Sequence, residues 1–200
     1  LYLGQISVLP VLLVLLGCCT VRGKGGSGLL IGFAAALEPT VLLFTLLLWR
    51  TGRRTAVLST AVTFTICTTL AWAVLPADSW TYWAHHPGGL GLGASPDSLG
   101  NQSLHGALLR LGFRGPLEVV LYLALSAAVV LVALPRAARY ARDGQQLLAV
   151  AVTGCVAVAV SPTTWQHQLL WVLLAVTGRV GRRVADRRVW PVVVILVMTL

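Results

Sequence analysis

The sequence predicts an all-α integral membrane protein, folded as a polytopic helical bundle. Three observations predict this fold class: the composition, a series of long apolar segments, and the placement of the basic residues. Hydrophobic residues make up 57% of the 200 residues, charged residues make up 10%, and the mean hydropathy is +0.84. These values lie far outside the range of soluble globular domains.

Apolar segments follow one another along the whole chain, at residues 1–19, 28–49, 55–75, 117–134, 145–160, 165–177 and 189–200. Most of them approach the roughly 20 residues that a helix needs to cross a bilayer. The sequence starts at Leu1 rather than Met and stops inside an apolar run. We therefore expect residues 1–200 to be the C-terminal portion of a single polytopic membrane domain.

Basic residues are concentrated in the short connections between apolar segments. Four clusters hold thirteen of the fifteen Lys and Arg residues: Arg22 and Lys24; Arg50, Arg53 and Arg54; Arg136, Arg139 and Arg142; and Arg179, Arg182, Arg183, Arg187 and Arg188. The positive-inside rule predicts that all four clusters are cytoplasmic. Membrane topology thus accounts for the net charge of +9, and no nucleic-acid partner is expected.

The segment 28–49 has a basic cluster at each end, which a helix that crosses the membrane once cannot satisfy. A re-entrant hairpin bent at Glu38 and Pro39 resolves this conflict, because each arm of about ten residues spans only about 15 Å. Pro39 also removes a backbone donor at the bend. The alternative is a single proline-kinked span that is an exception to the charge rule.

With the hairpin, the later segments alternate in direction, and two connections face away from the cytoplasm: residues 76–116 and 161–168. These connections hold all four histidines and the two remaining arginines: His85, His86, His105, His167, Arg110 and Arg114. We expect a functional site on this outer face of a multi-pass cell-membrane protein. No metal site is expected, because His85 and His86 have no carboxylate at ligand spacing.

The first outer connection contains GNQSLHGALLR, residues 100–110. On a helical wheel, one half collects the polar positions and glycine: Asn101, Gln102, His105, Gly106 and Arg110. This pattern predicts an interfacial helix whose polar face meets water or a cavity, with Gly106 leaving room in its middle. Arg110 offers a planar fork that suits a phosphate. The alternative is a surface helix with ordinary solvated polar residues.

The second outer connection reads SPTTWQHQ, residues 161–168. Ser161 suits an N-cap and Pro162 suits the first turn of a helix that carries His167 and Gln168. Helix starts of this kind accept anions. The alternative is an N-cap with an interfacial Trp165 and a hydrated histidine.

Four phrases in this order resemble the polyprenol-phosphate-sugar-dependent membrane glycosyltransferases of glycosyltransferase family 87: GQISVL, GLLIGFAAALEPTVLLF, GNQSLHGALLR and SPTTWQHQ. The resemblance implies a GT-C-like bundle and a hexosyltransferase that uses a polyprenyl phosphosugar such as decaprenyl phosphomannose. It implies a lipid-linked or glycan acceptor, an extracytoplasmic site, and no cofactor besides the lipid-linked donor. Two positions depart from the family pattern: Glu38 stands where a Lys is usual, and Gln168 stands where a His is usual.

The mechanism implied by the resemblance is a single, inverting displacement at the anomeric carbon. Arg110, Ser161 and His167 are then the candidates for the donor phosphate, because cationic groups and N–H donors stabilise a departing phosphate. The candidates for the sugar or the acceptor are Asn101, Gln102, His105, Gly106 and Gln168. The general base is expected upstream of residue 1, so no catalytic residue is assigned here.

Two other classes of protein remain as alternatives. A secondary transporter is one, because re-entrant helices and carboxylates such as Glu38 also mark transport sites. The absence of a visible internal repeat and the position of the polar residues outside the midplane argue against a transporter. The other is a noncatalytic membrane protein of envelope assembly, which the departure at Glu38 leaves open.

Overall fold

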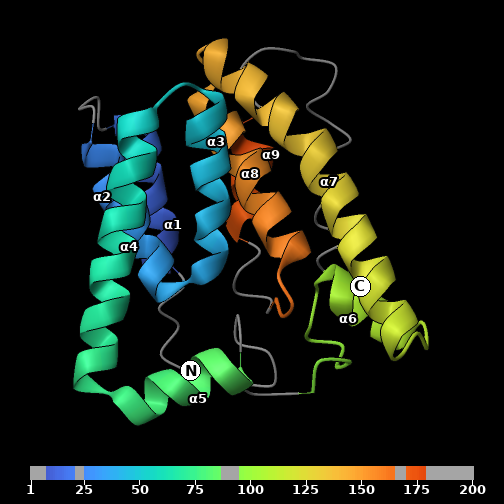
Figure 1. Cartoon of the computed structure of the whole chain (residues 1–200). Coiled ribbons are helices and arrows are strands. Elements are labelled where there is room, and N and C mark those ends of the chain that lie inside the picture. Colours follow the sequence, from blue (N-terminus) through green and yellow to red (C-terminus); the bar gives the residue numbers. More distant parts are fainter. Residues whose placement is uncertain (1–7, 21–24, 87–94, 165–169, 179–200) are drawn as a thin grey trace, which may run out of the picture.

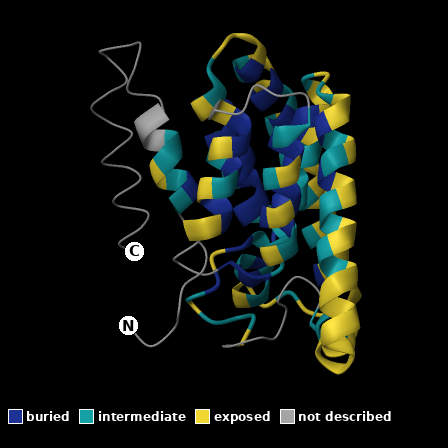
Figure 2. Cartoon of the chain, turned by 90° about the vertical axis from the view of Figure 1, so that its left-hand side faces the viewer, coloured by how far each residue is buried: buried dark blue, intermediate teal, exposed yellow. Residues whose placement is uncertain are grey.

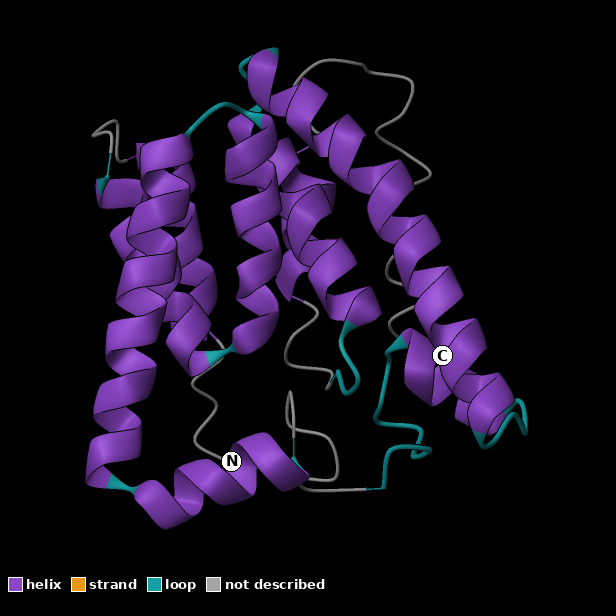
Figure 3. Cartoon of the chain, in the orientation of Figure 1, coloured by secondary structure: helices purple, strands orange, loops and turns teal. Residues whose placement is uncertain are grey.

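The computed structural model describes residues 8–20, 25–86, 95–164 and 170–178. All regular secondary structure in these ranges is helical, as the sequence predicts (Figure 3). In chain order the elements are α1 (Val8–Leu15), the π-helix η1 (Leu16–Thr20), α2 (Gly26–Leu37), the 3₁₀-helix η2 (Pro39–Leu42), α3 (Leu43–Arg50), α4 (Arg54–Val74), α5 (Pro76–His85), α6 (Leu104–Arg110), α7 (Pro116–Arg142), α8 (Gln146–Val160) and α9 (Leu170–Gly178).

The longer helices run back and forth between two ends of the molecule (Figure 1). α2 runs down in this view, α3 runs up, α4 down, α7 up and α8 down. We call the upper end, where α3, α4 and α7 place Arg50, Arg53, Arg54, Arg139 and Arg142, the basic end. The opposite end, which holds Glu38, α5, α6 and residues 161–164, is called the loop end.

The chain reverses its direction between α2 and α3 at Glu38 and Pro39. Glu38 has an extended backbone (φ −140°, ψ 98°), the conformation that a following proline favours. Its N–H still donates to the carbonyl of Ala34, at 2.9 Å. Pro39 then opens η2, because a proline fits the first position of a helix. Two short antiparallel helices therefore stand where the sequence has one apolar segment.

Two glycines let α2 lie directly against α4. A Cβ atom at Gly28 would stand 2.1 Å from the carbonyl oxygen of Ala56, and one at Gly32 would stand 2.7 Å from that of Thr60. The spacing Gly28-x-x-x-Gly32 places both glycines on one face, and this arrangement brings helix backbones close together in membranes. The GLLIG phrase therefore packs two helices against each other.

The packed core lies between α1, α2, α3, α8 and the last turns of α7. Phe44 of α3 and Trp171 of α9 meet in it, with ring centroids 5.3 Å apart. Figure 2 shows buried residues between the helices and exposed residues on their outer sides. Because α3 and α8 occupy the centre, most of α4 and α7 remains at the periphery.

Among the described helices, α4 and α7 are long and apolar enough to cross a membrane. Their 21 and 27 residues correspond to lengths of about 30 and 40 Å at 1.5 Å per residue. Apolar side chains on them are exposed, such as Ile66 at 52% and Leu123 at 59%. An outer surface of this kind suits contact with lipid.

α5 is a helix inside the connection 76–116, where the sequence analysis expected only a loop before residue 100. Pro76 stands at its start, Asp78 lies in its first turn and His85 lies in its last turn. A proline and an acid at the start and a histidine at the end follow the preferences of helix ends. α5 lies across the loop end in Figure 1.

Candidate functional site

The two connections that the sequence analysis singled out meet at the loop end. The N–H of Gln102 donates to the carbonyl of Thr164 at 2.8 Å, and the hydroxyl of Ser103 donates to the carbonyl of Pro162 at 3.1 Å. Residues about 60 positions apart in the sequence are thereby joined. We call this contact between residues 96–105 and 161–164 the junction.

Asn101 is the centre of the junction and is fully buried (0% exposed). Its Nδ2 donates to the carbonyl of Pro96 at 2.8 Å and to that of Pro162 at 3.4 Å. Its Oδ1 accepts from the N–H of Thr164 at 2.9 Å and from that of Ser103 at 3.2 Å. Both functions of the amide are used inside the protein, so Asn101 holds the site together.

α6 is shorter than the helix that the sequence analysis expected. It begins after Ser103, whose hydroxyl caps it by accepting from the N–H of Gly106 at 3.1 Å. Asn101 and Gln102 therefore precede the helix, and the predicted polar face that includes them is wrong. A serine in extended backbone caps a helix start strongly, and this local preference overrides the apparent periodicity. Gln102 is exposed, and its amide donates to the carbonyl of Leu99 at 2.7 Å.

The space beside Gly106 is filled by Asn101. Gly106 is buried, and a Cβ atom there would stand 2.8 Å from the Cγ, Nδ2 and backbone oxygen of Asn101. The expectation that Gly106 leaves room on a face directed at water or a cavity is therefore corrected, since Asn101 occupies that room.

His105 is the polar side chain of α6 that faces α7. Its Nδ1 lies 3.0 Å from the carbonyl oxygen of Pro162, and its Nε2 lies 3.4 Å from Oε1 of Glu118. Because a carbonyl oxygen only accepts, Nδ1 must carry a hydrogen. Nε2 and Oε1 of Glu118 then attract each other when one of these two atoms carries a proton. The tautomer of His105 thus follows from its backbone partner.

Glu118 and Tyr122 are site residues that the sequence analysis missed. Glu118 is 6% exposed, and its Oε1 has no closer hydrogen-bond donor among the described residues. The Tyr122 ring contacts His105 in a tilted arrangement, with ring centroids 5.4 Å apart, and its hydroxyl donates to the carbonyl of Val160 at 2.6 Å. Glu118 could have been noticed in the sequence as a carboxylate in an apolar segment. Its place in the first turn of α7 is also explained by the preference of acidic residues for helix starts.

Arg110 ends α6 and reaches back to the preceding loop. Its Nη1 donates to the carbonyl of Asn101 at 2.7 Å and to that of Ser98 at 2.9 Å. Both bonds use one nitrogen of an exposed residue, so with respect to the described residues the donors on Nη2 and Nε remain for a ligand. Arg110 thus braces the loop and still presents a cation at the loop end.

Arg114 has a different environment, although it is only four residues away. Its Nη2 lies 3.2 Å from Oδ2 of Asp97; the Arg114 side chain is largely exposed and the Asp97 side chain is partly exposed. A hydrogen bond from the Ser95 hydroxyl, and then one from Arg114, lower the pKa of the Asp97 carboxyl group. Asp97 therefore stays ionised and neutralises Arg114.

Ser161 does not begin the following helix. It is the C-cap of α8, and its hydroxyl donates to the carbonyl of Thr163 at 2.7 Å. An N-cap side chain would instead accept a hydrogen bond. This corrects the expected helix start at Ser161 and Pro162. His167 and Gln168 lie outside the described residues, as does Trp165.

Glu38 also lies at the loop end, and α5 passes close to it. Thr40 donates its hydroxyl hydrogen to Oε1 of Glu38 at 3.1 Å. Burial, and then the negative charge of Glu38, raise the pKa of the Tyr82 phenol on α5. This carboxylate therefore belongs to the same end of the molecule as the junction.

Within residues 8–20, 25–86, 95–164 and 170–178, no three His, Cys, Asp or Glu side chains are grouped closely enough to hold a metal ion. What the described loop end offers is one exposed guanidinium group that is not paired with a carboxylate among the described residues, a histidine paired with a buried carboxyl group, and several backbone groups fixed by Asn101. Such an arrangement can hold an anion beside polar groups of fixed orientation.

Residues 1–162 match the model of glycosyltransferase family 87. This stretch includes α1 to α8, the junction residues Asn101, His105 and Pro162, and Arg110. The chain belongs to glycosyltransferase family 87.

Curated relatives agree with the membership in family 87. The chain is 34% identical over 86% of its length to a polyprenol-phosphate-mannose-dependent alpha-(1-2)-phosphatidylinositol mannoside mannosyltransferase of Mycobacterium tuberculosis. It is 30% identical over 94% of its length to a protein of the same name from Mycolicibacterium smegmatis. The chain spans 40% and 44% of these two relatives. No solved structure matches the chain significantly.

Proposed function

We propose that this chain is part of a membrane mannosyltransferase that transfers mannose from a polyprenyl phosphate to a lipid-linked or glycan acceptor. The names of the two relatives support the donor and the sugar. The observation that carries the proposal is the junction, because it joins His105 to residues 161–164, which precede His167 in the sequence, and because Arg110 is hydrogen-bonded to Asn101 of the same junction.

The proposed enzyme crosses the membrane several times, with its loop end outside the cytoplasm. α4 and α7 supply two spans. The described basic end carries Arg50, Arg53, Arg54, Arg139 and Arg142, and the positive-inside rule assigns such an end to the cytoplasm. On this placement, α2 and α3 form a re-entrant hairpin that enters from the cytoplasm and turns at Glu38 and Pro39.

The proposed reaction is a single displacement with inversion at the anomeric carbon of mannose. A hydroxyl oxygen of the acceptor forms the new bond to this carbon while its bond to the phosphate oxygen breaks. The hydroxyl proton goes to a general base that we assign to no residue of this chain. The electron pair of the broken bond stays with polyprenyl phosphate, whose charge increases, so a cation beside it lowers the barrier.

Within this reaction, Arg110 is the residue proposed to contact the donor phosphate through Nη2 and Nε, together with His167. Asn101, Ser161 and Gly106 shape the site through contacts within the protein, which is a smaller role than direct contact with a substrate. Gln102 and Gln168 remain the proposed contacts to sugar or acceptor hydroxyl groups, whereas His105, whose ring nitrogens lie against Pro162 and Glu118, orients the site.

The proposal is tested by transfer of radiolabelled mannose in membranes that contain the full-length protein. We expect label from polyprenyl phosphomannose to enter an organic-extractable glycolipid and no transfer from a nucleotide sugar once synthesis of the lipid donor is blocked. Absence of transfer with several polyprenyl phosphosugars would instead favour a transporter or an assembly protein.

A further inference from the structure

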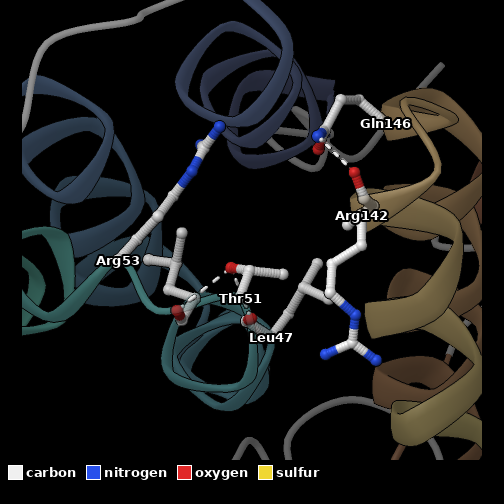
Figure 4. Close-up of a pocket in the computed structure, with 7 residues that line it drawn as sticks. Leu47, Thr51, Arg53, Arg142 and Gln146 are labelled. Atoms are coloured by element: carbon white, nitrogen blue, oxygen red, sulfur yellow. Dashed lines mark hydrogen bonds between the residues drawn. The ribbon is translucent and has the colours of Figure 1, made fainter.

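The basic end contains a pocket that the proposed sugar transfer does not use. It has a volume of about 200 Å³ and is lined by Leu47, Leu48, Thr51, Arg53, Ala141, Arg142 and Gln146. Figure 4 shows Arg53 and Arg142 on opposite sides of it. The pocket is formed by the end of α3, the turn into α4, the end of α7 and the start of α8. Segments about 90 residues apart in the sequence thus converge on it.

The pocket is polar on one side and positively charged. Arg53 is half-buried, and Arg142 reaches the carbonyl of Arg50 with Nη1 at 3.5 Å, the limit of a hydrogen bond. The Thr51 hydroxyl donates to the carbonyls of Leu47 and Leu48, so toward the pocket it only accepts. The amide nitrogen of Gln146 donates one hydrogen to Ala141 at 2.9 Å and retains a second.

In the part of the chain that the structure describes, no acidic side chain lines the pocket. The ion pairs among the described residues join His105 to Glu118 and Arg114 to Asp97, all at the loop end. Two helices end at the pocket and two begin there, so their dipoles largely cancel. The arginines therefore determine its charge, and bringing like charges around a hollow is unfavourable unless an anion occupies it.

The positive-inside rule explains why arginines are numerous at this end, but it does not require two of them to line one pocket. The other feature is the apolar wall of Leu47 and Leu48, which are 4% and 2% exposed. Nearby, the guanidinium carbon of Arg54 lies 5.8 Å from the ring centroid of Trp49, whose side chain is exposed. Tryptophan paired with arginine is typical of the headgroup region of a bilayer.

We propose that this pocket binds the phosphate group of an anionic ligand through Arg53 and Arg142, and that the ligand is the headgroup of an anionic phospholipid. Arginine pairs with phosphate through parallel N–H donors, and basic pockets between helices at the cytoplasmic surface suit phospholipid headgroups. A volume of 200 Å³ holds roughly six water molecules at about 30 Å³ each, which is room for a phosphate and part of its substituent. The assignment of this phosphate to a phospholipid rests on the membrane placement proposed above. It does not depend on sugar transfer.

The test is binding to the purified full-length protein, measured by native mass spectrometry and by thermal unfolding in detergent. The probes are phosphatidylglycerol, phosphatidylcholine and inorganic phosphate. We expect phosphatidylglycerol to bind and to raise the unfolding midpoint, and phosphatidylcholine to do neither. The double variant Arg53→Gln with Arg142→Gln should weaken phosphatidylglycerol binding about tenfold or more, since it removes two charge-assisted contacts.

The matched control is Arg136→Gln with Arg139→Gln, which also removes two positive charges, from the last turns of α7, at residues that do not line the pocket. It should bind phosphatidylglycerol within about twofold of the wild type. Equal weakening by both double variants would overturn the pocket in favour of general charge attraction. If inorganic phosphate binds and phosphatidylglycerol does not, the pocket is a phosphate site, and the proposal that its ligand is a phospholipid headgroup is overturned. Mannose transfer, assayed on the same variants, reports separately on the proposed function.

Discussion

At the scale of single residues, the junction depends on Asn101. Replacing it by aspartate preserves its shape, but the new carboxylate faces the carbonyl oxygens of Pro96 and Pro162. We expect Asn101→Asp to lower the free energy of unfolding by about 3 kcal/mol or more, since it loses two donors and buries an unpaired charge.

The unfolding midpoint of the full-length protein in detergent measures this effect. Gln102→Glu is the control, because it makes the same change at an exposed neighbour whose side chain has one local hydrogen bond. Equal midpoints for the two variants would contradict the role given to Asn101.

The sequence predicted that the two outer connections hold the polar groups, and the structure brings those connections together. The sequence did not predict which polar side chains make hydrogen bonds within the protein. Periodicity cannot distinguish a polar residue that faces a cavity from one that forms a hydrogen bond with a distant backbone group. Ser103 was a readable signal for the start of α6. The contact between His105 and Glu118 joins separate elements and leaves no local pattern.

At the scale of elements, the contact between α2 and α4 depends on the absence of a side chain at Gly28. The Cβ atom of a valine at this position would stand only 2.1 Å from the carbonyl oxygen of Ala56. We expect Gly28→Val to separate the helices and to lower the free energy of unfolding by about 3 kcal/mol, the upper part of the range typical of overpacking, so that the unfolding midpoint falls clearly.

Leu29→Val is the matched control on the next residue, whose side chain is 54% exposed. It introduces the same β-branched side chain into the same helix but should change the midpoint little. Equal loss of stability in both variants would mean that helix propensity, rather than the close contact, is responsible.

Most elements follow from the apolar pattern: the segments 55–75 and 145–160 closely match α4 and α8, and 117–134 lies within the longer α7. The bend between α2 and α3 lies at Glu38 and Pro39, where proline chemistry places a turn. α5 was missed, because its aromatic and polar residues have no long apolar period and its helix signals are confined to its ends.

At the scale of the whole molecule, the two ends should lie on opposite sides of the membrane. We introduce single cysteines, after removal of the native ones, at exposed positions: Leu99 at the loop end, and Gly52 and Asp143 at the basic end. An impermeant thiol reagent added outside intact cells should label Leu99→Cys and should label the other two only after permeabilisation.

Gly52 lies in open space, so a cysteine fits there, although its φ of 77° costs a side chain about 1 kcal/mol. Labelling of Gly52→Cys from outside would refute the re-entrant hairpin, and labelling of Asp143→Cys would refute the assignment of the basic end. The charge clusters predict which end faces the cytoplasm, whereas the packing of α3 between α4, α7 and α8 depends on contacts that no sequence pattern encodes.

The central claim is that a cation at the loop end stabilises the phosphate that leaves during mannose transfer. Arg110→Ala tests it most directly, with Arg114→Ala as the control, since Arg114 is four residues away but already paired with Asp97. In the full-length protein, Arg110→Ala should lower the rate of mannose transfer from polyprenyl phosphomannose by about 100-fold or more, and Arg110→Lys should restore part of it. Arg114→Ala should stay within about threefold of the wild type. Wild-type transfer by Arg110→Ala, or an equal loss in both alanine variants, would contradict the account.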